Sequence, residues 1–423
     1  MNAVELAGLE LHSLMVLRHG RVIAEGYWHP YRADHPQMLF SVSKSFTSTA
    51  IGFAVAEGRL TVEDKVSGFF PDDLPETVSD NLAAMRVKDL LTMATGHADE
   101  PNLWLSEDSW VRGFLANPVP HAPGSKFLYN TPATYMLSAI LEKITGESLL
   151  AYLETRLFLP LGIEGATWER CPFGICTGGY GLSVKTEDIA KFGQFYLQKG
   201  VWKGVRLLPE AWFEEATHGH VSNGSEPTND WHQGYGYQFW RCRFGAYRGD
   251  GAFGQFCIVL PEQDAVVAIT SGLENMHGVI DLVWKHLLPA FAEARENSYL
   301  PVRLRALEIV VPAAAHFPAD SHREFHTAEN ETVTLSQSGD LMTLAVGADE
   351  RFEARFSTWH SASRTTSRAA WTDANTLVIR TMVNETPYVY TRMLTIDGNN
   401  LCLQTIRSCG FGTTVFPDIL ASS

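Results

Sequence analysis

The sequence predicts an α/β protein of the α+β kind, with an antiparallel sheet flanked by helices and a separate all-β domain. Two β-rich regions, near the start of the chain and at 235–272, enclose a long helical region. Near residue 300 the pattern changes to short alternating runs separated by Asn, Asp and Gly turns. A chain of 423 residues suits two or three domains, at ~100–200 residues each.

The first half of the chain is expected to contain one β-hairpin followed by helices. Residues 11–29 predict two strands around the turn at 18–20. From Ser41 to about Glu57 the apolar spacing is helical, and Gly58 ends the helix. Further helices are expected at 87–97, 134–158 and 187–200, the first two within a helical insertion at about 60–170.

The second half is expected to complete the sheet and then to form the β-rich domain. Residues 235–272 predict three antiparallel strands, and a helix is expected at 280–294. The boundary is predicted near 296–305, so that 1–298 form one domain and 299–423 a second. The second domain holds no candidate nucleophile–base pair. It is expected to shape or cover a cleft, or to mediate association, without doing chemistry.

Charge and hydropathy exclude several classes of partner. A formal net charge of −15 provides no basic field for phosphates, so neither nucleic acid nor an anionic membrane surface is an expected partner. The apolar stretches are much too short to span a bilayer. The first residues lack the features of an export signal, which predicts a cytoplasmic protein, although an exported mature form would look the same.

Cysteine and histidine do not predict a metal site or a cofactor. Six cysteines are scattered along the chain, far below the density of a disulfide scaffold. Cys171 and Cys176 could form a local bridge, but no second Cys/His pair completes a zinc site. The pair His218 and His220 lacks further ligands at metal spacing, so a solvated loop is the favoured interpretation.

Ser41 and Lys44 begin the first long helix and form an S-x-x-K tetrad. Residues three apart share a helix face, so the Lys44 amine can reach the Ser41 hydroxyl. Serine needs a base to become a nucleophile, and lysine can serve when burial depresses its pKa. Free N–H groups at a helix start can donate to an oxyanion. The alternative is that Ser41 only caps the helix and Lys44 is solvated.

Four segments in order resemble a known family. The segment around Ser41 and Lys44, then LLTMATGH, the segment 123–146 and the block beginning GGYGLSVKTEDIAKF are similar to class C β-lactamases, penicillin-binding proteins and related esterases. The similarity extends to about residue 290. It implies a β-lactamase/transpeptidase-like fold, an acyl-enzyme on Ser41, Lys44 as proton-transfer partner, and no metal or cofactor.

The resemblance also suggests a catalytic tyrosine. Tyr129 matches the tyrosine that assists proton transfer to the leaving group. Thr131 stands where the family commonly has asparagine, and Asn130 precedes it, so either side chain could contact the substrate. Tyr135 is the rival tyrosine, but its place within an apolar helical pattern favours a core position.

The third motif departs from the family, which usually carries K-[ST]-G or H-x-G there. The corresponding stretch runs from Arg248 through Asp250, Gly251 and Ala252. Glycine allows close backbone approach to a substrate, and the N–H of Ala252 could pair with that of Ser41 as an oxyanion hole. Arg248 could replace the missing cation for a substrate carboxylate. A structural bulge is the alternative.

These residues predict a serine hydrolase that acts on a small-molecule ester, amide or β-lactam. An esterase or amidase is favoured. A β-lactamase or D-amino-acid peptidase is the alternative, disfavoured by the altered third motif. A non-catalytic binding protein on the same scaffold is a third reading, and the joint presence of Ser41, Lys44 and Tyr129 argues against it.

Overall fold

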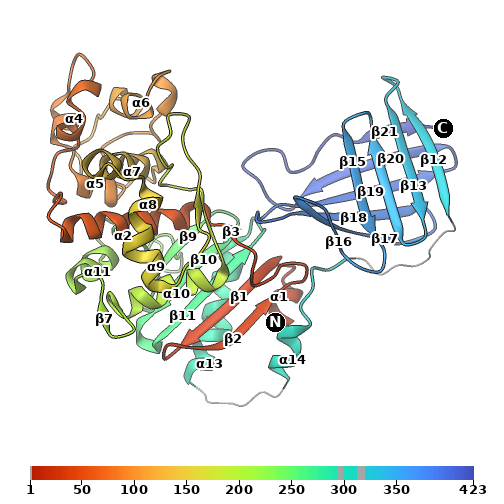
Figure 1. The fold of residues 1–423 in the computed structure, drawn as a ribbon, viewed down its shortest axis with the longest axis horizontal. Helices are drawn as coiled ribbons and strands as arrows, with labels where there is room; N and C mark the ends of the chain where they lie inside the picture. Colours follow the sequence, from red (N-terminus) through yellow and green to blue (C-terminus); the bar gives the residue numbers. More distant parts are fainter. Residues whose placement is uncertain (1, 293–298, 312–319) are drawn as a thin grey trace.

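The computed structural model describes residues 2–292, 299–311 and 320–423. Figure 1 shows a sheet with helices gathered around it and, beside it, a unit of strands drawn in blue from the C-terminal part of the chain. This confirms the predicted fold class of an antiparallel sheet flanked by helices with an all-β C-terminal domain.

The first sheet has six strands in the order β2-β1-β11-β10-β9-β8, and every neighbouring pair is antiparallel. His19 and Gly20, both at positive φ, make the tight turn between the first two strands. The strands are β1 (Leu11–Arg18), β2 (Arg21–Tyr27), β8 (Trp240–Arg241), β9 (Tyr247–Gly251), β10 (Gln255–Leu260) and β11 (Ala265–Ser271). Ile, Val and Ala dominate β10 and β11, whose residues are all buried because layers cover both faces.

Helices α2 (Ser43–Ala56) and α10 (Thr186–Leu197) pack on one face of this sheet, which we call the inner face, and we call the opposite face the outer face. The rings of Phe46 and Phe192 stack between them, with centroids 3.8 Å apart. In Figure 1, a helical region lies on the side of α2 away from the sheet and includes α4 (Asp80–Ala84), α5 (Val87–Leu91), α6 (Trp110–Ala116) and α7 (Thr131–Thr145). The same half of the chain also contains α3 (Val66–Phe69), α8 (Leu149–Leu153) and α9 (Leu159–Leu161). The opposite face carries α1 (Asn2–Leu6), α12 (Met276–Leu282), α13 (Leu288–Ala292) and α14 (Leu300–Arg305).

Several helices are shorter than the apolar spacing predicts. The expected helix 134–158 is divided, because Gly146 takes a left-handed conformation at the end of α7 and Ser148 caps α8 anew. The expected helix 87–97 stops at Leu91, since Met93 and Gly96 both have positive φ. The strand expected from residue 235 is reduced to the two residues of β8.

The C-terminal sheet has ten strands and closes on itself where β15 pairs with β17. Alternating residues such as Leu335, Leu344 and Leu377 form its own core. The strands are β12 (Ser321–Thr327), β13 (Thr332–Ser338), β14 (Leu341–Val346), β15 (Glu350–Arg355), β16 (His360–Ser361), β17 (Thr365–Trp371), β18 (Thr376–Val383), β19 (Val389–Asp397), β20 (Asn400–Arg407) and β21 (Ile419–Ser422).

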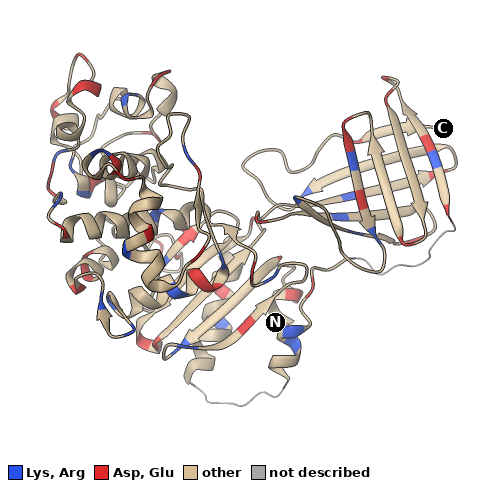
Figure 2. Cartoon of the chain, viewed as in Figure 1, with Lys and Arg blue, Asp and Glu red and all other residues tan. Residues whose placement is uncertain are grey.

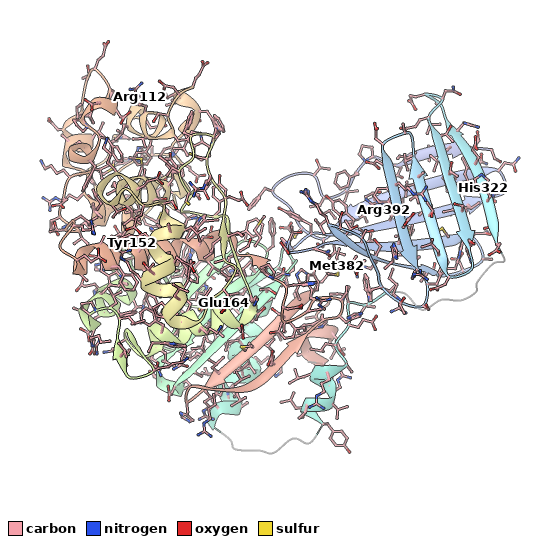
Figure 3. All side chains as sticks on the ribbon, viewed as in Figure 1. Arg112, Tyr152, Glu164, His322, Met382 and Arg392 are labelled. Atoms are coloured by element: carbon pink, nitrogen blue, oxygen red, sulfur yellow. The ribbon has the colours of Figure 1, made fainter. Side chains whose placement is uncertain are left out.

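The two cores meet around the predicted boundary. Leu304, Leu307 and Ile309, beyond the predicted junction at 298/299, belong to the core on the outer face of the first sheet. The junction itself adjoins residues 293–298, which lie outside the described residues, as does the end of the helix expected at 280–294. Met382 and Val389 of the second sheet also enter the first core, and Figure 3 shows Met382 where the barrel faces the first sheet.

Within the described residues, no helix is both long and apolar enough to cross a membrane. Figure 2 shows basic and acidic residues interspersed along both parts of the chain.

Candidate active site

Ser41 lies in a 3₁₀ turn, η1 (Phe40–Val42), directly before α2 begins at Ser43. The helix predicted from Ser41 therefore begins with a 3₁₀ turn, and the α-helix proper begins two residues later than predicted. The Lys44 Nζ lies 2.9 Å from the Ser41 Oγ, as the three-residue spacing predicts. Lys44 is 1% exposed, which rules out the alternative interpretation that its side chain is solvated.

Three acceptors surround the Lys44 amine. Besides Ser41, the Nζ donates to the carbonyl oxygen of Gly179 at 2.7 Å and to the Thr131 Oγ1 at 3.3 Å. A neutral amine has two N–H donors and one lone pair. If the donors go to Gly179 and Thr131, the lone pair is left for the Ser41 hydroxyl proton. This is the geometry that a general base requires.

Burial lowers the pKa of Lys44 to about 7, although the carboxylates of Glu100 and Asp250 act to raise it. A lysine in an apolar setting loses part of the hydration that favours its charged form. The amine is therefore substantially uncharged near neutral pH and can accept a proton there.

The pH dependence of activity tests this state of Lys44. We expect kcat/KM to rise with pH and level off, with a midpoint near 7, because only the neutral amine accepts the proton. Glu100→Gln removes an anion that raises the pKa of Lys44, so the midpoint should move to lower pH. Glu107→Gln, at an exposed position, is the control. An unchanged or higher midpoint in Glu100→Gln would contradict this electrostatic account.

Tyr129 belongs to the segment directly before α7, and its ring lies beside Lys44. Its ring centroid is 5.0 Å from the Lys44 Nζ, and the ring stacks on Trp240 at 5.3 Å. Burial raises the pKa of Tyr129 well above its usual value, and a hydrogen bond with Ser41 acts in the opposite direction. Tyr135, the rival, is buried beside Cys171 in the core, 3.6 Å from that sulfur.

The structure separates the two residues after Tyr129. Thr131 faces the lysine, and its backbone N–H donates to the Glu100 Oε1 at 2.9 Å. Asn130 is fully buried and caps α7, with its Oδ1 accepting from the Ala133 N–H at 2.9 Å and its Nδ2 donating to the Thr95 hydroxyl. Of the two candidates for substrate contact, Thr131 is at the site and Asn130 is occupied in the cap.

The end of β9 lies against the turn that carries Ser41. A Cβ on Gly251 would be 2.2 Å from the carbonyl oxygen of Leu39, so only glycine allows this approach. Ala252 follows Gly251 directly. Among the described residues, no carbonyl accepts from the N–H of either Ser41 or Ala252. These two donors are available for an oxyanion.

Arg248 and Asp250 are brought together rather than exposed to a substrate. The Arg248 Nε donates to the Asp250 Oδ2 at 2.8 Å, and its Nη1 donates to the Asp230 carbonyl oxygen. Arg248 is fully buried under the rings of Trp231 and Trp240. Burial raises the pKa of Asp250, while Arg248 acts to lower it. The arginine is therefore buried in the wall of the site, with Nε and Nη1 paired and Nη2 without a hydrogen-bond partner among the described residues.

Two residues at the site carried no signal of their own in the sequence. Glu100 follows the LLTMATGH segment, and nothing in its spacing indicates that it meets the start of α7. Gly179 lies in the glycine-rich turns at 174–181 and in the block beginning GGYGLSVKTEDIAKF that resembles the family, but neither pattern indicated that its carbonyl would meet Lys44. A Cβ there would be 2.7 Å from the Thr131 Cγ2, so glycine lets its carbonyl reach Lys44. Both depend on contacts between distant segments.

Metal ligation has no support in the part of the chain that the structure describes, which contains no group of three or more His, Cys, Asp or Glu placed to hold an ion. His220 instead stacks on Tyr237 with ring centroids 4.4 Å apart. Cys171 and Cys176 are both free and buried.

A buried lysine beside a serine is the arrangement that a serine hydrolase of the S-x-x-K type requires, and the family match and the hydrolase relatives support a hydrolytic enzyme of the serine hydrolase kind. The sequence profile of the family described as "Beta-lactamase" matches residues 9–281, more than half of the chain. The chain therefore belongs to this family, which confirms the predicted resemblance. The 6-aminohexanoate-dimer hydrolase of Paenarthrobacter ureafaciens is 26% identical over 280 residues, covering 60% of this chain and 71% of that protein.

Solved structures share the fold. A protein from Bacillus anthracis, named as a 6-aminohexanoate-dimer hydrolase, aligns with a TM-score of 0.58 and 21% identity, over 68% of this chain and 80% of its own. The octameric penicillin-binding protein homologue from Pyrococcus abyssi aligns over 100% of this chain and 98% of its own, with a TM-score of 0.54 and 16% identity. The latter match includes the C-terminal sheet.

Proposed function

We propose that this chain is an esterase or amidase that forms an acyl-enzyme on Ser41 and hydrolyses small acyl substrates. The observation that carries the proposal is the 2.9 Å contact between the Ser41 Oγ and the Nζ of a buried lysine whose pKa is lowered to about 7. A serine beside a neutral amine is an activated nucleophile. The 6-aminohexanoate-dimer hydrolase among the relatives supports a small amide as one substrate class.

Acylation uses the groups around Ser41 in sequence. As the Ser41 Oγ attacks the substrate carbonyl carbon, its proton passes to the Lys44 amine. The carbonyl oxygen becomes an oxyanion that accepts from the N–H groups of Ser41 and Ala252. When the tetrahedral intermediate collapses, the Tyr129 hydroxyl donates a proton to the leaving group and is reprotonated from Lys44. The high pKa of Tyr129 keeps it protonated for this donation.

Deacylation reverses these roles with water as the nucleophile. Water takes the place of the leaving group and gives its proton towards Tyr129 and Lys44, and Ser41 leaves the acyl carbon with a proton returned to it. Thr131 and Gly179 keep the amine in place through both half-reactions.

The third motif favours esters and simple amides over β-lactams. In the family, a Lys or His there provides the usual cation for a substrate carboxylate, and within the corresponding stretch 248–255 the cationic side chain is Arg248. That guanidinium is fully buried and its Nε is paired with Asp250, so it offers a carboxylate no exposed donor, and its Nη2, which has no hydrogen-bond partner among the described residues, is buried as well. A β-lactamase or D-amino-acid peptidase remains the second candidate, through the family itself.

We expect short-chain p-nitrophenyl esters to be hydrolysed with a higher kcat/KM than nitrocefin or penicillin G. The physical reason is that burying a substrate carboxylate without a paired cation costs affinity in both ground state and transition state. Steady-state kinetics on a panel of both substrate classes provide the measurement, with Ser41→Ala as the background control. A kcat/KM for nitrocefin well above that for the esters would favour the second candidate.

A further inference from the structure

Two loops of the C-terminal barrel contact segments that adjoin the candidate active site. The loop between β18 and β19 accepts a main-chain hydrogen bond at Glu385 O from the Met38 N–H, at 2.9 Å, three residues before Ser41. The loop after β20 donates from the Gly410 N–H to the Glu274 Oε1 at 3.0 Å. A Cβ at Gly272 would be 2.2 Å from the Pro387 carbonyl oxygen, so the backbone of the first loop lies directly against the backbone at Gly272.

The residues beneath these loops flank the two candidate oxyanion donors. Phe40 directly precedes Ser41, and Phe253 directly follows Ala252. Their rings meet edge to face with centroids 5.2 Å apart. Both residues have positive φ, 47° for Phe40 and 64° for Phe253, a conformation that aromatic residues seldom adopt. Such strain persists only where neighbouring groups hold it in place.

The C-terminal barrel provides the neighbouring groups. Cys409 is fully buried in one cluster with Phe40 and Phe253, and Tyr388 packs against that cluster. The Tyr388 ring is 6.0 Å from the Phe253 ring. The Phe411 ring is 4.8 Å from the Phe253 ring and 6.0 Å from the Phe40 ring. Although Phe411 is 79% exposed, Phe40 and Phe253 are only 8% and 4% exposed. These five residues form what we call the aromatic clamp.

We propose that the C-terminal barrel is a positioning element of the active site. Through the aromatic clamp, Tyr388, Cys409 and Phe411 hold Phe40 and Phe253, and thereby keep the N–H groups of Ser41 and Ala252 aimed at one oxyanion. The barrel contributes no reacting group. This inference rests on the proposed acyl-enzyme chemistry, and extends it by assigning a role to a domain that the matched family region, residues 9–281, does not include.

The clamp should affect the transition state more than the bound substrate. An oxyanion hole acts on charge that develops only during attack, so its misplacement lowers kcat with little change in KM. Loss of one whole donor costs about 10²–10³-fold in kcat, and displacement of two donors by a weakened clamp should cost roughly 10-fold or more.

The experiment uses the full-length chain with Phe411→Ala, Tyr388→Ala and the double variant. Kinetic constants are measured with p-nitrophenyl butyrate, together with the inhibition constant of phenylboronic acid. The boronate forms a tetrahedral adduct whose oxygen occupies the oxyanion position. We expect kcat to fall and the boronate inhibition constant to rise by similar factors, while KM stays within about twofold. Tyr388→Phe and Phe411→Tyr should retain near-normal values, because each keeps an aromatic ring.

Leu420→Ala is the control, because Leu420 is an exposed apolar residue on β21 of the same barrel. Tyr388→Ala could unfold the barrel, but Phe411 is exposed, so Phe411→Ala should leave the thermal unfolding midpoint nearly unchanged. A folded Phe411→Ala variant and a folded double variant that both keep wild-type kcat and boronate affinity would overturn the proposal. So would a rise in KM at constant kcat, which indicates uniform substrate binding instead.

The two proposals fail in different ways. If wild-type Ser41 takes no phosphonate label and phenylboronic acid does not inhibit, the acyl-enzyme chemistry is wrong. The positioning role of the aromatic clamp, which rests on that chemistry, is then wrong as well. If Ser41 is labelled while the clamp variants behave as the control does, only the role of the barrel is wrong.

Discussion

Replacement of Ser41 by alanine is expected to abolish covalent labelling by a fluorophosphonate probe and to reduce ester hydrolysis to background. No other hydroxyl in the described residues accepts from the Lys44 Nζ except that of Thr131, at the longer distance of 3.3 Å. The fold should persist, because the Ser41 side chain is only partly buried and contributes one hydroxyl to packing. Intact-mass spectrometry after incubation with the probe measures the adduct directly.

Ser43→Ala is the matched control within the same motif. Its hydroxyl accepts from the Leu182 N–H at 3.1 Å, whereas the Lys44 amine donates to Ser41, Thr131 and Gly179. The variant should therefore still acquire the adduct. Its thermal stability should fall instead, because the buried Leu182 N–H loses its acceptor. A Ser41→Ala protein that gains the adduct at the wild-type rate would show that the nucleophile lies elsewhere.

Loss of either proposed proton-transfer partner is expected to be the second large effect. Lys44→Ala and Tyr129→Phe should each lower kcat by about 10²–10⁴-fold, the usual range for a missing general acid or base. Since both side chains contact Ser41 and act on one proton, the double variant should lose less than the product of the two single effects. Steady-state kinetics with one p-nitrophenyl ester provide the three ratios.

Two controls accompany these variants. Tyr135→Phe removes a core hydroxyl near Cys171, so kcat should stay close to that of the wild type. Lys88→Ala removes a surface lysine that pairs with Glu63 and should also have little effect. Strictly multiplicative losses in the Lys44/Tyr129 double variant would mean that the two residues act independently, against the arrangement around Ser41.

Local sequence was sufficient to predict the parts of the site that lie close together in the chain. Ser41 and Lys44 are three residues apart, and a helical turn of any tightness brings such a pair within reach. The alternating runs beyond residue 320 likewise predict strands with their own core, because a period of two is a property of the strand alone. The resemblance supplied Tyr129, whose role stays a prediction.

Helix lengths were predicted less well, for a reason visible in the backbone. Apolar spacing continues across Gly146, but that glycine takes a left-handed conformation and ends α7. Similarly, positive φ at Met93 and Gly96 ends the helical run after Leu91. Periodicity reports which face is buried and contains little information on where the chain turns.

The sequence by itself determined the fold class, the S-x-x-K pair and the all-β character of the C-terminal region, since each depends on residues a few positions apart. Tertiary structure alone decided what surrounds that pair: the Gly179 carbonyl and Glu100 near Lys44, Asn130 turned into a helix cap, and Arg248 paired with Asp250. It also brought Phe411 to Phe40, across 371 positions of the chain. These contacts join segments far apart in sequence, and packing rather than local propensity selects them.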